Sequence, residues 1–244
     1  MQKKYSHNFY KDKPQETEYP ANTIIQLVQE ILPDVRSAVD FGCGVGAWLA
    51  ALKDRGVDNI QGFDGPWVNQ ELLVIPSEAF KRTDLNQEIR LDQKYDLAIS
   101  LEVAEHLPQS SAKTFVQSIT NASDFVLFSA AIPLQGGTHH VNEQWQDYWA
   151  ELFKQHDYEV FDVIRPQIWN DEKIPYWYKQ NILLFVKQGQ IDKLNSEKLN
   201  TLNSNMPLCL VHPDIYLSKI NKMNTIKGSI KSFRRALKKI FTGS

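Results

Sequence analysis

Cysteine is scarce in this chain, and its two cysteines, Cys43 and Cys209, are too few for a disulfide framework. The sequence also lacks any Cys/His cluster with the spacing of a zinc site, and it lacks an apolar run of the roughly 18 residues that would span a bilayer. No apolar segment occurs in residues 1–8, so a secretory leader is not expected. These absences disfavour a secreted disulfide scaffold and an integral membrane protein, and they make the cytoplasm the expected location.

Charge is distributed unevenly along the 244 residues. Residues 219–244 contain eight Lys or Arg and no Asp or Glu, whereas the rest of the chain holds 19 basic and 29 acidic residues, a net charge of −10. An acidic body and a basic tail are expected to meet different partners. Hydrophobic residues make up 42% of the chain, which is enough for one α/β domain with a buried core.

Apolar periodicity predicts alternating strands and helices, and therefore a mainly parallel sheet with helices on both faces. The last two strands are separated by a loop rich in Trp, Tyr and Pro without a helical period, so the final strand is expected to insert antiparallel. The predicted strands cover residues 38–41, 59–64, 79–84, 95–100, 125–128, 158–164 and 182–186, and the predicted helices cover residues 22–32, 47–53, 110–120 and 143–156.

Composition divides the chain into four predicted segments. Residues 1–21 are polar and aromatic without a clear period, which indicates an N-terminal arm. The alternating strands and helices form one domain over residues 22–187. An Asn-, Lys- and Gln-rich stretch begins a linker and packing segment over residues 188–218, and residues 219–244 form the basic tail.

A glycine-rich turn after the first predicted strand carries the clearest functional pattern. Gly42 and Gly44 allow a sharp turn and a close approach of the backbone to a ligand, but this pattern alone also satisfies a dinucleotide fingerprint. Asp40 argues against a dinucleotide, because a carboxylate at this position would repel the pyrophosphate of NAD. The same carboxylate suits a ligand that carries an ammonium group. Asp64 and Asp84 end the next two strands, where they can accept from ribose hydroxyls and from an adenine amino group.

In combination these features closely resemble the class I, Rossmann-like, S-adenosylmethionine-dependent methyltransferases. The resemblance covers about residues 22–187, implies a seven-stranded Rossmann-like sheet, and implies S-adenosylmethionine as the cofactor. It rests on residues 39–46, Asp64, residues 83–85 and residues 100–108.

The resemblance also implies roles for individual residues. Asp40 and the glycine loop would hold the methionine end of the cofactor, and Asp64 would hold its ribose. Leu101 and Glu102 would line the cofactor near the methyl group.

A hydroxyl acceptor must lose a proton during methyl transfer, and a histidine suits that task. Residues 136–145, 178–181 and 212–216 resemble motifs of methyltransferases encoded with bacterial surface-glycan genes. In that pattern the histidine before Val-Asn is His140, which we therefore predict to be the base. His106 is the alternative, although its Glu-His-Leu-Pro context is often structural in this class. His139 is also a candidate by its position, and a role for His139 or His140 in ordering the loop is a third interpretation.

The sequence favours a sugar, glycan or small-molecule hydroxyl as the acceptor, and two other functions remain open. One is RNA methylation with phosphates held by the basic tail, which the acidic body disfavours. The other is a cofactor-binding assembly partner without catalysis. No Asp/Asn-Pro-Pro-aromatic tetrapeptide follows the fourth strand, which argues against methylation of base amino groups. His139, His140 and Glu143 could hold a cation, but adjacent loop histidines are weak evidence, and no metal site is predicted.

The tail is expected to form an amphipathic helix that lies on an anionic membrane surface, at the inner face of the membrane. One apolar stripe is flanked by basic residues, which is typical of a helix in the headgroup layer. Docking of the stripe on the acidic body or on a protein partner is the alternative. The stripe consists of Ile226, Ile230, Phe233, Leu237, Ile240 and Phe241, and the basic residues are Lys227, Lys231, Arg234, Arg235, Lys238 and Lys239.

Overall fold

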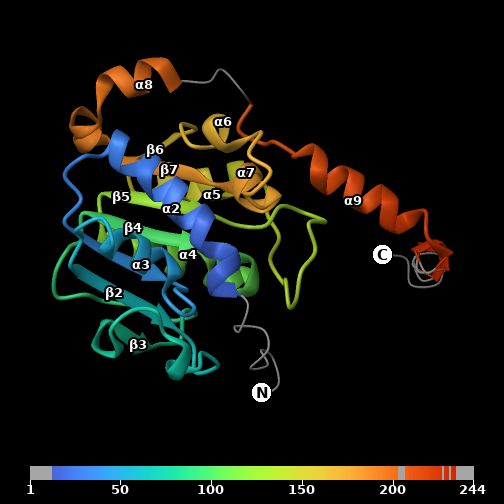
Figure 1. Ribbon diagram of the computed structural model, residues 1–244, viewed down its shortest axis with the longest axis horizontal. Coiled ribbons are helices and arrows are strands. Elements are labelled where there is room, and N and C mark those ends of the chain that lie inside the picture. Colours follow the sequence, from blue (N-terminus) through green and yellow to red (C-terminus); the bar gives the residue numbers. More distant parts are fainter. Residues whose placement is uncertain (1–12, 203–206, 227, 231, 235–244) are drawn as a thin grey trace. The chain divides into compact units, whose positions relative to one another are not determined.

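The computed structural model describes residues 13–202, 207–226, 228–230 and 232–234. Its centre is a seven-stranded sheet with the order β3-β2-β1-β4-β5-β7-β6 (Figure 1). Neighbours from β3 to β5 pair parallel, and β7 pairs antiparallel with both β5 and β6. The predicted Rossmann-like α/β class and the antiparallel last strand are confirmed. The strands are β1 (Ser37–Phe41), β2 (Asn59–Asp64), β3 (Phe80–Arg82), β4 (Leu97–Leu101), β5 (Phe125–Ser129), β6 (Tyr158–Phe161) and β7 (Leu183–Lys187).

Helices cover both faces of the sheet because successive strand residues point to opposite faces. Ala38 of β1 belongs to the core on the side of α2 and α3, whereas its neighbour Val39 belongs to the core on the side of α4 and α5. The inner strands β1, β4 and β5 are buried along their whole length, whereas the edge strands β3 and β6 expose part of theirs. The helices are α2 (Lys13–Ile31), α3 (Ala47–Lys53), α4 (Ala112–Ala122) and α5 (Gln146–Lys154).

The prediction of an arm over residues 1–21 is wrong for residues 13–21, which form the first turns of α2. These turns carry no apolar stripe, so periodicity does not detect them. A tertiary contact helps to hold them, because the Tyr19 hydroxyl donates to Asp171 Oδ2 at 2.9 Å. Residues 1–12 lie outside the described residues.

The prediction of a helix-free loop before β7 is also wrong, since α6 (Arg165–Ile168) and α7 (Tyr176–Asn181) form there. Each is shorter than two helical turns, so neither shows a period. Arg165 is fully buried and holds both helices: it pairs with Asp162 and donates to the carbonyls of Gln180 and Leu208.

The segment after β7, predicted as a linker and packing segment, packs on the domain over residues 188–202. Residues Gln188–Lys193 form a 3-10 helix, and α8 (Ser196–Leu202) follows it. The Asn195 amide donates to the Ile31 carbonyl at 2.8 Å, and Lys198 Nζ lies 2.7 Å from Glu30 Oε2 at the end of α2.

A second compact unit comprises Leu210–Ser244, so the division falls inside the predicted segment 188–218. It contains α9 (Pro213–Met223), whose N-cap His212 accepts from the Asp214 amide. Residues 228–230 and 232–234 are also helical, and the remaining stripe residues from Leu237 onward lie outside the described residues. Among the described helices, none is both long and apolar enough to cross a membrane.

Candidate active site

The glycine loop joins β1 to α3 at the carboxyl edge of the sheet. Gly42 and Gly44 have φ angles of 94° and 56°, in the left-handed region that favours glycine. A side chain on Gly42 would overlap Val103, which follows β4. The amides of Gly42 and Cys43 donate to the Phe63 carbonyl at 2.7 and 3.1 Å, which ties the loop to β2. The predicted glycine loop therefore forms a turn whose positive φ angles, together with the close approach of Val103 to Gly42, suit glycine.

Asp40 lies beneath this loop with a carboxyl oxygen that has no partner. The residue is 2% exposed, and Oδ2 makes no hydrogen bond within the described part of the chain. Burial, and secondarily the negative charge of Asp64, raise the pKa of Asp40 well above its usual value. Because a buried carboxyl without a partner is costly, this group suits a cationic ligand.

Asp64 ends β2 beside the loop and is already engaged by it. Its carboxylate accepts from the Gly44 amide at 2.7 Å and from the Gly65 amide at 2.6 Å. Burial raises the pKa of Asp64, and these two hydrogen bonds partly oppose the increase. Asp64 therefore orders the glycine loop, and its predicted contact with the cofactor's ribose remains a prediction.

Asp84 lies two residues beyond β3 and is exposed. Its carboxylate accepts from the backbone amide of Asn86 at 3.0 Å and from the side-chain amide of Asn86 at 2.6 Å. It thus closes a local turn, and its predicted contact with adenine remains a prediction.

Glu102 follows Leu101, the buried last residue of β4, and enters a network of side-chain amides. Gln135 donates to Oε2 at 2.9 Å, and Asn181 donates to Oε1 at 3.0 Å. Burial raises the pKa of Glu102 to about 7 despite these hydrogen bonds. Its φ of 56° turns the chain sharply as it leaves the strand. The β4 end, the β5–α5 loop and α7 therefore meet at this carboxyl group, although Asn181 was not predicted to lie there.

His140 lies in the loop between β5 and α5, where Glu143 holds it. The Nδ1 atom of His140 is 2.9 Å from Glu143 Oε1, and the same carboxylate accepts from the amides of Leu134 and Gly136 at 2.8 and 2.6 Å. A carboxylate at Nδ1 places the ring proton there and the lone pair on Nε2. Gly137 leaves room for this second nitrogen, because a side chain at 137 would overlap it.

The structure brings the two predicted histidines together. The rings of His106 and His140 pack edge to face with centroids 4.8 Å apart. Glu105 is fully buried beside them, and one ligand atom from each of these three residues lies within 4.8 Å of the others. Glu105 was not among the predicted site residues. Its position next to His106 in the sequence was the available indication, but only the fold places His140 opposite.

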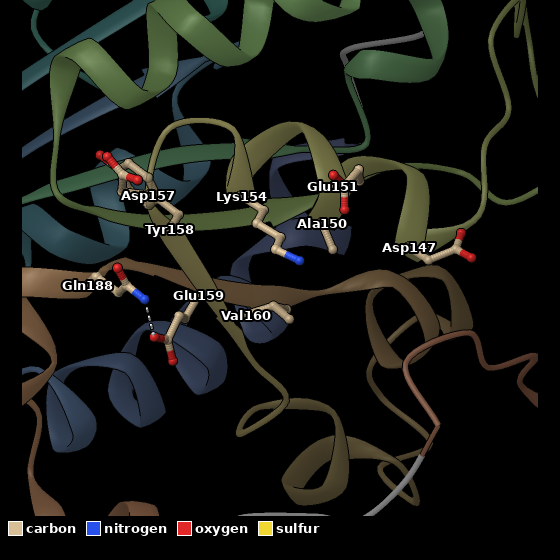
Figure 2. A pocket seen from close by; sticks show the side chains of 9 residues that line it. All are labelled: Asp147, Ala150, Glu151, Lys154, Asp157, Tyr158, Glu159, Val160 and Gln188. Carbon is tan, nitrogen blue, oxygen red and sulfur yellow. Dashed lines mark hydrogen bonds between the residues drawn. The ribbon is translucent and has the colours of Figure 1, made fainter.

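A separate open groove runs along α5 and the edge strand β6 (Figure 2). It is lined by four carboxylates, those of Asp147, Glu151, Asp157 and Glu159, around the amino group of Lys154. The groove shares no residue with the loop, acids and histidines described above. Its negative lining does not suit an anionic ligand.

A family model described as "Methyltransferase domain" matches residues 15–169, which is more than half of the chain. The chain belongs to this methyltransferase family. Among curated proteins no sequence match is found.

Solved structures share the fold at low sequence identity. Streptomyces venezuelae DesVI is 14% identical with a TM-score of 0.53, covering 72% of this chain and 92% of its own. Magnesium protoporphyrin IX methyltransferase (ChlM) from Synechocystis PCC 6803, solved with bound SAM, is 21% identical with a TM-score of 0.50, covering 75% and 86%. The methyltransferase domain of bacterial CtHen1-C is 17% identical with a TM-score of 0.51, covering 70% and 98%.

The predicted cofactor, S-adenosylmethionine, is confirmed at the level of the family. The residues present fit it, since Asp40 offers to the cofactor's ammonium group a buried carboxyl oxygen that makes no hydrogen bond within the described residues. Asp40, the glycine loop and Asp64 of this methyltransferase would hold the cofactor.

An Asp40→Asn variant is expected to be more stable than the wild type without cofactor, and to bind S-adenosylmethionine more weakly. Because burial raises the pKa of Asp40, the folded wild type loses stability as pH rises from the unfolded pKa near 4 through the folded one. The uncharged variant avoids this loss, so its free energy of unfolding at pH 8 should exceed that of the wild type by about 1–3 kcal/mol. Urea unfolding at pH 4 and pH 8, with calorimetric cofactor titration, measures both effects. Equal stability of the two proteins at pH 8 would contradict the assigned cost.

Proposed function

We propose that this methyltransferase methylates a hydroxyl group of a sugar or glycan intermediate. The observation that carries the proposal is the pairing of His140 with Glu143 beside His106 at the carboxyl edge of the sheet. A hydroxyl must lose its proton when it is methylated, and Nε2 of His140 accepts that proton. Glu143 then stabilises the resulting imidazolium and keeps the ring oriented.

The cofactor side of the site is formed by other residues. When bound, S-adenosylmethionine supplies an activated methyl group on a sulfonium. Asp40 would hold its ammonium group, Asp64 its ribose hydroxyls and Asp84 its adenine amino group. Leu101 and Glu102 would lie near the methyl group, with the Glu102 carboxylate held by Gln135 and Asn181.

Aromatic side chains support a sugar as the acceptor. Trp145, which precedes α5 directly after the His140 loop, is 39% exposed, and Trp177 in α7 is 36% exposed. Such rings pack against the apolar faces of hydroxylated ligands. The similarity of residues 136–145 and 178–181 to glycan-associated methyltransferases points the same way.

The test is a transfer assay with methyl-labelled cofactor against nucleotide sugars, lipid-linked glycans and cellular RNA. Label is expected on a sugar hydroxyl of one of the first two classes. A reaction without enzyme is the control for enzyme-dependent transfer. Label on RNA, lost at high salt, would replace the glycan proposal with RNA methylation. Cofactor binding without transfer to any acceptor would favour a non-catalytic assembly partner.

We further propose that the basic tail holds the enzyme at an anionic membrane surface, close to lipid-linked acceptors. Within the C-terminal unit, Ile226, Ile230 and Phe233 of the predicted stripe are 82%, 49% and 64% exposed. A helix with apolar and basic faces binds anionic lipid headgroups, and each Lys or Arg contributes on the order of 1 kcal/mol.

The full chain is therefore expected to sediment with anionic phosphatidylserine vesicles at low salt, whereas a chain ending at Asn224, the C-cap of α9, stays in solution. High salt should release the full chain, because screening weakens the attraction. Neutral vesicles are the control. Equal sedimentation of both chains, or none of either at low salt, would contradict the membrane proposal and favour docking of the stripe on protein.

A further inference from the structure

Glu105 is a fully buried acid at the centre of the candidate active site. Neither of its carboxylate oxygens has a hydrogen-bond partner in the part of the chain that the structure describes. Burial raises the pKa of Glu105 well above its usual value, and the negative charge of Glu102 adds to the increase. Burying a carboxyl group without a hydrogen-bond partner costs free energy of folding unless a ligand binds the group.

The surroundings of Glu105 add negative charge instead of compensating it. The side chains that act on it through space are two more carboxylates, Glu102 and Glu143. Glu105 and Glu143 thus both lie beside the rings of His106 and His140. A cation is the ligand that such a cluster attracts.

The distances fit a shared ion. One ligand atom each from Glu105, His106 and His140 lies within 4.8 Å of the other two. Ligands about 2.1 Å from a common cation are separated by about 3 Å when adjacent and about 4.2 Å when opposite. Small side-chain adjustments would therefore bring the three atoms onto one ion.

Hydrogen bonds hold the two halves of the cluster together. The amides of Val141 and Asn142 donate to the Glu105 carbonyl at 2.9 and 3.1 Å, which fixes the His140 loop against the segment after β4. Glu143 holds Nδ1 of His140 and directs the lone pair to Nε2. Carboxylates in this supporting position orient the histidine ligands of metal sites.

We propose that Glu105, His106 and His140 form a binding site for a divalent transition-metal cation. Two imidazoles with one carboxylate suit Mn²⁺, Fe²⁺, Co²⁺ or Zn²⁺ better than the oxygen-seeking Mg²⁺ and Ca²⁺. Three protein ligands leave coordination positions for water or an acceptor oxygen. That last role rests on the proposed function, whereas binding of the cation does not. A bound cation and an accepted proton would compete for the same lone pair of His140.

Mn²⁺ binding to the full chain, freed of metal with a chelator, tests the site. Loss of the free-ion EPR signal is expected to show one Mn²⁺ per chain, and Mn²⁺ should raise the melting temperature. Glu105→Gln and His140→Asn should each weaken binding by more than about 100-fold, the upper end of what loss of a supporting residue costs. His139→Asn is the matched control and should bind like the wild type, since His139 is exposed and its φ of 62° is one that asparagine tolerates.

Folding of the variants is checked in chelator, where Glu105→Gln should melt no lower than the wild type because a neutral amide replaces a buried acid. No Mn²⁺ binding by the wild type, or wild-type affinity in Glu105→Gln, would overturn the site. These results need no acceptor and no turnover. Mn²⁺ binding without methyl transfer would instead refute the proposed function and leave the cation site standing.

Discussion

Replacing His140 with alanine is expected to lower turnover by about 10²–10⁴-fold, while the affinity for S-adenosylmethionine stays nearly unchanged. The ring lies in the β5–α5 loop, apart from the Asp40 and Asp64 carboxylates that face the glycine loop. The variant therefore loses the proton acceptor without losing a cofactor contact. Steady-state kinetics on the acceptor found in the transfer assay, with calorimetric titration of the cofactor, measures both quantities.

His106 and His139 provide the comparison for this experiment. His139→Asn should keep the wild-type rate, because that side chain is exposed. If His140→Ala keeps the full rate while His106→Ala is inactive, then His106 is the base. If both variants remain active, positioning of the two substrates alone carries the reaction. Equal loss of cofactor affinity and turnover in His140→Ala would indicate a role in loop order.

An Asp64→Ala variant is expected to bind S-adenosylmethionine more weakly by roughly 1.5–3 kcal/mol for each charge-assisted hydrogen bond to ribose that is lost. For one bond this corresponds to about 10–150-fold in the dissociation constant. Isothermal titration calorimetry measures the change directly. Asp54→Ala, which removes an exposed acid at the far end of α3, is the control and should bind normally.

Asp64 also orders the glycine loop, so the variant is compared with Asp64→Asn. The amides of Gly44 and Gly65 bind different carboxylate oxygens, so the asparagine keeps an acceptor for only one of them and carries no charge. If the affinity falls only in alanine, Asp64 acts through the loop; a larger fall in alanine and a clear fall in asparagine agree with a carboxylate that binds the cofactor. Unchanged affinity in both would move the ribose-binding acid elsewhere.

The sheet and its cofactor end could be predicted because their patterns are local. A strand that is buried on both faces is a short apolar run, and β1, β4 and β5 all have this form. In a parallel sheet the carboxyl ends of the strands share one edge, so Asp40 and Asp64 had to lie near Gly42. The family match supports the same interpretation independently.

Elements without a period could not be found in this way. The first turns of α2 and the short helices α6 and α7 carry no apolar stripe. Contacts with residues distant in the sequence support them, such as Tyr19 with Asp171 and Arg165 with Leu208. The segment after β7 also lacks an apolar period, and its sequence therefore predicts the start of a linker. Its polar residues interact with α2 in the folded chain.

Local sequence patterns were therefore sufficient for the order of the elements, the acids at the strand ends and the choice of histidines to consider. Only the folded chain places His140 against His106 and buries Glu105 beside them, with carboxylate oxygens that make no hydrogen bond within the described part of the chain. That arrangement depends on how the loop after β5 packs on the segment after β4, more than thirty residues earlier in the chain. Such packing depends on the shapes and hydrogen bonds of both segments at once, so it cannot be predicted from the sequence of either segment alone.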